Sequence, residues 1–143
     1  MSHARRELLR VIDANVNRAL EGLRVCEEIA RFDLEQPRLF RRLRALRHDV
    51  ALTVRRLPLA SAELIRSRES HRDIGRRAPA SPLRCRDQLV IINFQRAKES
   101  LRTLEECARV VAPRLIGMFQ RLRFRTYDVE RDTVLWLATV RHP

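Results

Sequence analysis

Glycine, proline and aromatic residues are scarce in this sequence: its 143 residues include three glycines, six prolines and seven aromatic side chains. So few helix breakers leave long segments free to be helical. So few aromatics disfavour a surface on which nucleobases stack. No apolar run approaches the roughly 20 residues that span a membrane. We therefore expect a soluble all-α protein without a membrane segment.

Several common kinds of site are also missing. The three cysteines, Cys26, Cys85 and Cys107, lack the spacing of a zinc site. There is no Walker-type glycine-rich loop and no serine, histidine and aspartate arrangement of a hydrolase. The first residues lack the apolar region of a secretory signal. The cysteines then fit reduced thiols, and we expect a cytoplasmic protein.

The charge balance is strongly basic. The formal net charge is +12, and Lys98 is the only lysine, so nearly all of the positive charge is arginine. A basic surface attracts phosphates, and the planar guanidinium binds phosphate oxygens in pairs. A GC-rich genome that encodes arginine at ordinary solvated positions explains the excess equally well. With 45% apolar and 34% charged residues, we expect one folded domain over 1–143.

Apolar residues three and four positions apart predict a series of helices. Pro37 and Pro113 suit first turns, Pro58 suits a stop, Ser61 suits a cap, and Ser81 before Pro82 suits a helix start. Residues 68–79 form the least helical stretch. The predicted helices cover about 5–32, 37–57, 62–67, 82–111 and 113–140.

The sequence contains an internal repeat. Residues 15–31 align without gaps on residues 93–109, and ten of the seventeen positions are identical. The following helices also match, since Arg42-Leu43-Arg44 corresponds to Arg121-Leu122-Arg123. Two such hairpins, at about 5–57 and 82–140, can close a four-helix bundle with an approximate internal two-fold axis.

Polar residues recur in the repeat as well as apolar ones. A core explains the repeated apolar stripe, but it does not require the polar positions to recur. Some of them have the spacing of intrahelical ion pairs, such as Glu21 with Arg24. Inherited ion pairs are therefore one explanation, and a duplicated binding site is the other. The recurring polar pairs are Asn15/Asn93, Arg18/Arg96, Glu21/Glu99, Arg24/Arg102, Glu27/Glu105 and Glu28/Glu106.

The polar loop between the hairpins is a second candidate site. Arg68 can bind phosphate, Ser70 supplies a hydroxyl, Asp73 can hold Mg²⁺, and Gly75 lets the backbone approach a ligand. A solvated linker explains the same composition. His71 is best explained as an exposed loop residue.

Taken together, residues 15–31, the pattern Arg68-x-Ser70-x-x-Asp73-Ile74-Gly75, and residues 93–109 resemble a small helical family of thiamine biosynthesis. Its members are monofunctional hydroxymethylpyrimidine-phosphate kinases, found alone or fused in front of thiamine-phosphate synthase. The resemblance implies phosphoryl transfer from ATP with Mg²⁺ to 4-amino-5-hydroxymethyl-2-methylpyrimidine phosphate. The synthase is similar to a (β/α)₈ barrel, for which this length and strand content do not suffice.

The resemblance and the chemistry of phosphoryl transfer suggest a role for each candidate. Arg68, Ser70 and the segment 73–75 would meet the ATP phosphates, with Asp73 holding Mg²⁺. One of Glu27 or Glu105 would accept the hydroxyl proton, and Asn15 and Asn93 would bind the pyrimidine. The arginines expected to clamp the substrate phosphate and the transferred group are Arg18, Arg24, Arg96 and Arg102.

Two other functions remain open at this stage. The net charge suits a basic helical module that binds nucleic acid or a protein. An inactive partner of thiamine-phosphate synthase would also explain the resemblance. A homo-oligomer whose subunits share the site is compatible with either of these functions.

Overall fold

The computed structural model describes residues 3–140, and this part of the chain contains five α-helices and no strand. The all-α class is therefore confirmed for it. The domain expected over 1–143 extends into residues 1–2 and 141–143, which lie outside the described part. The helices are α1 (His3–Glu28), α2 (Pro37–Arg55), α3 (Ser61–Ser67), α4 (Arg86–Val111) and α5 (Ile116–Val140), with shorter helical turns at Ile29–Asp33, Ser70–Arg72 and Pro113–Leu115.

Helix α2 begins at Pro37, as predicted, and the side chain of Gln36 accepts a hydrogen bond from the Arg38 N–H at 3.2 Å. The predicted cap at Ser61 is one residue off. Ser61 is the first residue of α3, and the capping position is Ala60, whose N–H donates to the Glu63 carboxylate at 2.7 Å.

Helix α4 starts at Arg86, so the predicted start at Ser81-Pro82 is wrong. Every residue from Ser70 to Cys85 is exposed. A helix of this length gains most of its stability by burying an apolar face, and the chain before Arg86 has no face to bury. The proline pair Pro79 and Pro82 also holds the residues before them extended.

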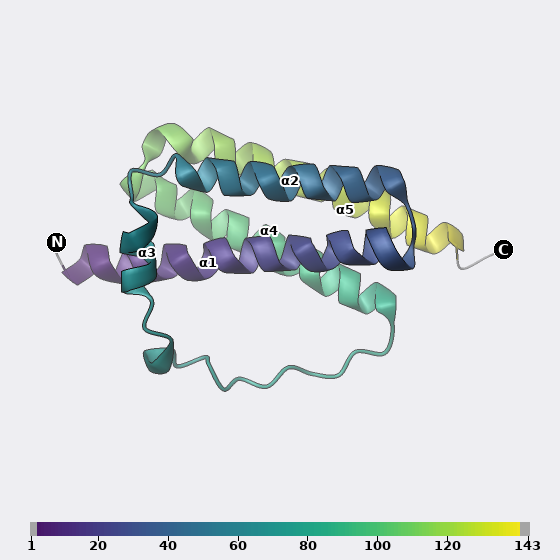
Figure 1. Cartoon of the computed structure of the whole chain (residues 1–143), viewed down its shortest axis with the longest axis horizontal. Helices are drawn as coiled ribbons and strands as arrows, with labels where there is room; N and C mark the ends of the chain where they lie inside the picture. Colours follow the sequence, from purple (N-terminus) through teal and green to yellow (C-terminus); the bar gives the residue numbers. More distant parts are fainter. Residues whose placement is uncertain (1–2, 141–143) are drawn as a thin grey trace.

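The four long helices pack in a ring in which each packs mainly against two others. Helix α1 lies against α4 and α2, and α5 completes the ring by packing against α4 and α2 (Figure 1). The most extensive contact joins α1 to α4, the equivalent first helices of the two repeats. The repeated apolar stripe forms the core, which includes Leu23 and its counterpart Leu101.

Helix α3 determines where the polar loop lies. It packs across the N-terminal part of α1, and its residue Leu64 is buried in the core (Figure 1). The chain that leaves α3 at Ser67 therefore starts beside α1, where Arg68 contacts Asp13, and then runs away from α1 to the start of α4 (Figure 1). None of the helices in residues 3–140 has the length and apolarity that crossing a membrane requires.

Candidate functional site

A groove lies where α1 meets α4, and its lining repeats the internal symmetry of the sequence. We call it the central groove; its volume is about 620 Å³, within the usual range for small-molecule sites. The repeat counterpart of every lining residue also lines the groove. The five pairs are Asn15/Asn93, Arg18/Arg96, Glu21/Glu99, Gly22/Ser100 and Val25/Thr103.

The two helices approach most closely at Gly22. A Cβ atom built on Gly22 would lie 2.8 Å from the backbone oxygen of Asn93, closer than real Cβ contacts come. Glycine here therefore allows the two backbones to touch. The equivalent position in α4 is Ser100, which carries a Cβ and is buried. The symmetry of the groove is thus approximate.

The two asparagines of the groove are held in the same way. The side-chain amide of Asn15 donates to the Val11 carbonyl at 2.8 Å, and that of Asn93 donates to the Leu89 carbonyl at 2.9 Å. Both side chains are buried. No described residue donates to either side-chain oxygen, so both oxygens are free to accept from a ligand.

Arg18 and Arg96 form no ion pair with any residue in the described part of the chain. Both side chains are exposed, and both line the groove. Many other arginines are paired within the protein, for example Arg42 with Asp132 at 2.7 Å. The repeat thus supplies two unpaired guanidinium groups to one groove, an arrangement suited to a phosphate.

The carboxylates of the groove are not equivalent. Glu99 accepts a hydrogen bond from the side chain of Gln95 at 2.8 Å. The counterpart of Gln95 is Asn17, whose amide donates to the Asp13 carbonyl at 3.0 Å. Among the residues of 3–140, none donates a hydrogen bond to the Glu21 carboxylate. Glu21 is therefore more available to a ligand than Glu99.

A second hollow, of about 470 Å³, lies between the N-terminal half of α1 and the polar loop. We call it the loop pocket. It brings together Arg68, Ser70 and Asp73 of the loop pattern, and it shares Asn15 and Arg18 with the central groove. Its other lining residues are Glu7, Arg10, Val11, Asp13, Ala14, Asn17 and Glu69.

Arg68 is the residue that fastens the loop to α1. Its Nε donates to Asp13 Oδ2 at 2.7 Å and its Nη2 donates to Asp13 Oδ1 at 2.8 Å. These hydrogen bonds to the buried carboxylate raise the pKa of Arg68 further. Asp13 thus occupies two N–H donors on one edge of the guanidinium. Only the remaining N–H groups are available to a ligand. The first role of Arg68 in this structure is to position the loop.

Asp73 and Gly75 form a local turn. The Gly75 N–H donates to Asp73 Oδ1 at 2.8 Å, and Gly75 does not line the loop pocket. The other carboxylates of the pocket, on Glu7, Asp13 and Glu69, are all ion-paired with arginines. Asp73 alone among them keeps a carboxylate without an ion-pair partner in the described chain.

Residues 3–140 hold no cluster of three or more potential metal ligands. Mg²⁺ in nucleotide sites commonly takes one or two carboxylates, with phosphate and water completing its shell. The exposed, unpaired carboxylate of Asp73 suits that kind of binding. The donor set at the loop pocket is therefore compatible with Mg²⁺ carried by a nucleotide.

Glu27 and Glu105 line neither the groove nor the loop pocket, contrary to their predicted role. Each is buried in an ion pair with the second helix of its own hairpin: Glu27 with Arg47, and Glu105 with Arg123 at 2.8 Å. These pairs join α1 to α2 and α4 to α5. Their geometry assigns both glutamates to the packing of the hairpins.

Arg24 and Arg102 also lie outside the two hollows. Arg24 pairs with Glu28 at 2.9 Å, and Arg102 pairs with Glu106 at 3.2 Å, each within its own helix. Both side chains are more than half exposed. Of the four arginines predicted to clamp phosphate, the structure therefore places only Arg18 and Arg96 together.

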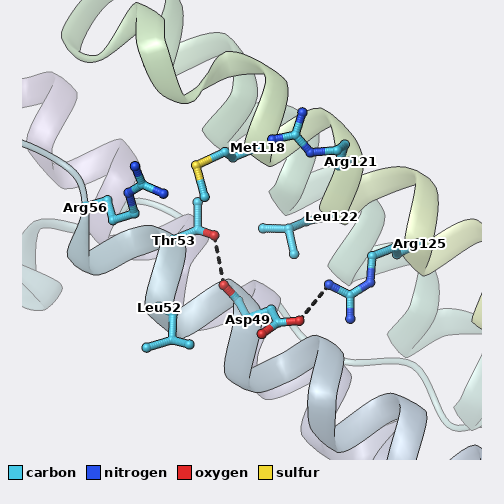
Figure 2. A pocket seen from close by; sticks show the side chains of 8 residues that line it. All are labelled: Asp49, Leu52, Thr53, Arg56, Met118, Arg121, Leu122 and Arg125. Carbon is cyan, nitrogen blue, oxygen red and sulfur yellow. Dashed lines mark hydrogen bonds and ion pairs between the residues drawn. The ribbon is translucent and has the colours of Figure 1, made fainter.

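A third hollow, of about 400 Å³, lies between α2 and α5, and Figure 2 shows its lining. Three arginines surround an apolar floor that includes Leu52 and Leu122. One of them, Arg125, is paired with Asp49 at 2.7 Å. None of the candidate site residues of the repeat or the loop lies here, and its lining does not pair repeat counterparts. We therefore place the candidate site at the central groove and the loop pocket.

A sequence model of the ThiD2 family matches residues 10–132. The chain belongs to the ThiD2 family. The match spans both repeats and the loop, and so it includes the central groove and most of the loop pocket. No solved structure gives a significant match to the chain.

Several curated proteins are similar to the chain over most of its length. A protein of Rhodopirellula baltica named thiamine-phosphate synthase is 35% identical over 136 residues, which cover 93% of this chain and 36% of that protein. A protein of the same name from Synechococcus sp. is 40% identical over 122 residues, covering 85% of this chain and 34% of that one. The chain thus spans about a third of the length of these relatives.

Sequence reasoning missed two residues of the site. Asp13 precedes the aligned repeat segment, and only the structure shows its contact with Arg68, which lies 55 positions away. Glu21 belongs to the repeated pattern, but its spacing to Arg24 suggested an intrahelical ion pair. Instead, Arg24 pairs with Glu28, and Glu21 lines the groove.

Proposed function

We propose that this protein acts in thiamine biosynthesis as a kinase, transferring a phosphoryl group from ATP with Mg²⁺ to 4-amino-5-hydroxymethyl-2-methylpyrimidine phosphate. The observation that carries the proposal is the pair of adjoining hollows that share Asn15 and Arg18. A kinase must hold two phosphorylated substrates side by side. Membership of the ThiD2 family and the names of its relatives support the choice of pathway.

The nucleotide phosphates occupy the loop pocket. Ser70 and the free N–H groups of Arg68 donate to them, and Arg18 adds a positive charge without an ion-pair partner in residues 3–140. Asp73 is the residue that would hold Mg²⁺ together with the phosphates. Bound Mg²⁺ would neutralise the charge on the phosphate oxygens during transfer.

The pyrimidine occupies the central groove. The side-chain oxygens of Asn15 and Asn93 are free acceptors, which suits the exocyclic amino group of an aminopyrimidine. Val25 supplies an apolar surface for the ring. The buried position of both asparagines fixes their orientation, so little freedom is lost when the ring binds.

In the transfer step an oxygen of the phosphate on the pyrimidine bonds to the γ-phosphorus, the bond from that phosphorus to the β–γ bridging oxygen breaks, and ADP leaves. The hydroxymethyl oxygen already carries this phosphate, so the proton to be removed is that of a singly protonated phosphate, and it passes to a carboxylate. Glu21 is the groove carboxylate without a hydrogen-bond donor among the described residues, whereas Gln95 holds Glu99. Glu21 therefore replaces Glu27 and Glu105 as the proposed proton acceptor.

Three variants test the proposal in an assay of Mg·ATP turnover with the pyrimidine monophosphate. Arg18→Ala and Asp73→Ala should each lower turnover by roughly 100-fold or more, because each removes charge stabilisation from the transferring group. Arg102→Ala is the control, since that arginine is exposed, ion-paired and outside both hollows. Circular dichroism should remain native for all three. Unchanged turnover in natively folded Arg18→Ala and Asp73→Ala would refute the site.

A further inference from the structure

The two halves of the central groove carry equivalent residues, yet they have different surroundings. Arg18 lines both the groove and the loop pocket, whereas its repeat counterpart Arg96 lines the groove alone. The loop that creates this difference is attached at one place, by the ion pair of Arg68 with Asp13 on α1. The repeat therefore supplies two identical arginines, and the loop makes them unequal.

The charges around these arginines favour different phosphates at the two ends. The loop-pocket end has Asp73, a carboxylate with no ion-pair partner in the described chain, which suits a polyphosphate that carries a divalent cation. The end near Arg96 has Glu99, which is already hydrogen-bonded to Gln95. Arg96 has no ion-pair partner among the described residues, and its guanidinium suits a metal-free phosphate monoester.

Resting on the proposed function, we propose that Arg96 binds the phosphate already present on the pyrimidine and so sets the preference for the monophosphate over the free alcohol. Arg18 then faces the group in transfer, because it is the arginine common to both hollows. Duplication would have produced two equal anion sites, and the loop has converted them into a nucleotide side and a substrate side.

The test is a binding titration by calorimetry, with three probes added separately: the pyrimidine monophosphate, the unphosphorylated alcohol, and a non-hydrolysable ATP analogue with Mg²⁺. For Arg96→Gln, affinity for the monophosphate should fall roughly tenfold or more, as expected when a charge-assisted hydrogen bond is lost. Affinity for the alcohol and for the nucleotide should stay within about twofold. Arg109→Gln is the matched control, because Arg109 is also an exposed arginine of α4 and pairs with Glu106 away from the groove.

A failure of the Arg96 inference can be distinguished from a failure of the kinase assignment on which it rests. A wild-type protein that makes no diphosphate refutes the kinase, and the titration still decides which ligand Arg96 contacts. Selective loss of the monophosphate in Arg96→Gln supports the inference. Loss of the nucleotide, or an equal loss of monophosphate and alcohol, overturns it. In a kinetically active protein, Arg96→Gln should raise KM for the monophosphate by roughly tenfold or more while KM for ATP stays within about twofold.

Discussion

The backbone of Gly22 lies directly against the backbone oxygen of Asn93, so close that a Cβ on Gly22 would come within 2.8 Å of it. This contact joins the first helices of the two repeats at the floor of the central groove. The spacing of α1 and α4, and so the width of the groove, depends on a residue that has no side chain.

Gly22→Ala should therefore destabilise the protein. Alanine gains about 1 kcal/mol of helix propensity, but overpacking against a backbone atom that cannot move aside costs about 1–3 kcal/mol or more. We expect a net loss in urea unfolding. Gly117→Ala is the matched control, because its Cβ would meet only the mobile end of Arg121 at 3.5 Å. A Gly22→Ala protein as stable as Gly117→Ala would contradict the close approach.

Glu105→Ala should reduce stability without impairing the site. Removing the carboxylate leaves the largely buried side chain of Arg123 without its main partner, and breaking such a buried pair costs about 3–5 kcal/mol. Arg109→Ala, which removes an exposed pair with Glu106, should cost much less. Urea unfolding measures both. A Glu105→Ala protein with nearly unchanged unfolding free energy but strongly reduced turnover would show that Glu105 takes part in the reaction.

Asp13→Ala should release the loop. Arg68 then loses the buried carboxylate that holds it on α1, and the nucleotide side of the site is no longer positioned. We expect KM for ATP to rise severalfold, KM for the pyrimidine monophosphate to stay within about twofold, and Asp13→Glu to recover part of the loss. Asp33→Ala is the control, since its pair with Arg86 is exposed and neither residue lines the loop pocket. Equal changes in both KM values would show only a general loss of structure.

The Cys26 thiol should make stability fall at alkaline pH. Burial, with the negative charge of Glu130, raises its pKa from 9.0 to about 12. Between these two values the unfolded chain releases the thiol proton and the folded protein keeps it. Folding stability from this group is therefore complete below pH 9 and falls as the pH rises, by about 1 kcal/mol per pH unit. Urea midpoints at pH 8 and 10 should show a larger fall for wild type than for Cys26→Ser. An identical fall would mean that the thiol titrates normally.

Much of the fold could be predicted from the sequence, because the apolar stripe and the proline positions follow local rules. The start of α4 could not be predicted in this way. It depends on the exposure of Pro82 and its neighbours, which bury no face against the described part of the chain. The contact of α1 with α4 is also non-local. It depends on small residues such as Gly22 at the crossing point, and periodicity alone does not reveal which helices meet.

The candidate site was only partly predictable for a related reason. The repeat marked Asn15 and Arg18 with their counterparts, and the structure brings all four into one groove. The same repeat also marked Glu27 and Glu105, whose partners differ between the copies. Arg47 pairs with Glu27, but the position equivalent to Arg47 is Thr126, and Glu105 is paired by Arg123 from another turn. Repetition therefore identifies polar positions that the fold or the site requires, but it does not show whether a given residue binds a ligand or packs one helix against another.

The most direct measurement of the central claim is incubation of the protein with the pyrimidine monophosphate and Mg·ATP, followed by mass spectrometry, with the unphosphorylated alcohol in a parallel reaction. We predict that the pyrimidine diphosphate appears in step with ADP and that the alcohol reacts far more slowly. Natively folded protein that forms no diphosphate and consumes no ATP would contradict the kinase assignment.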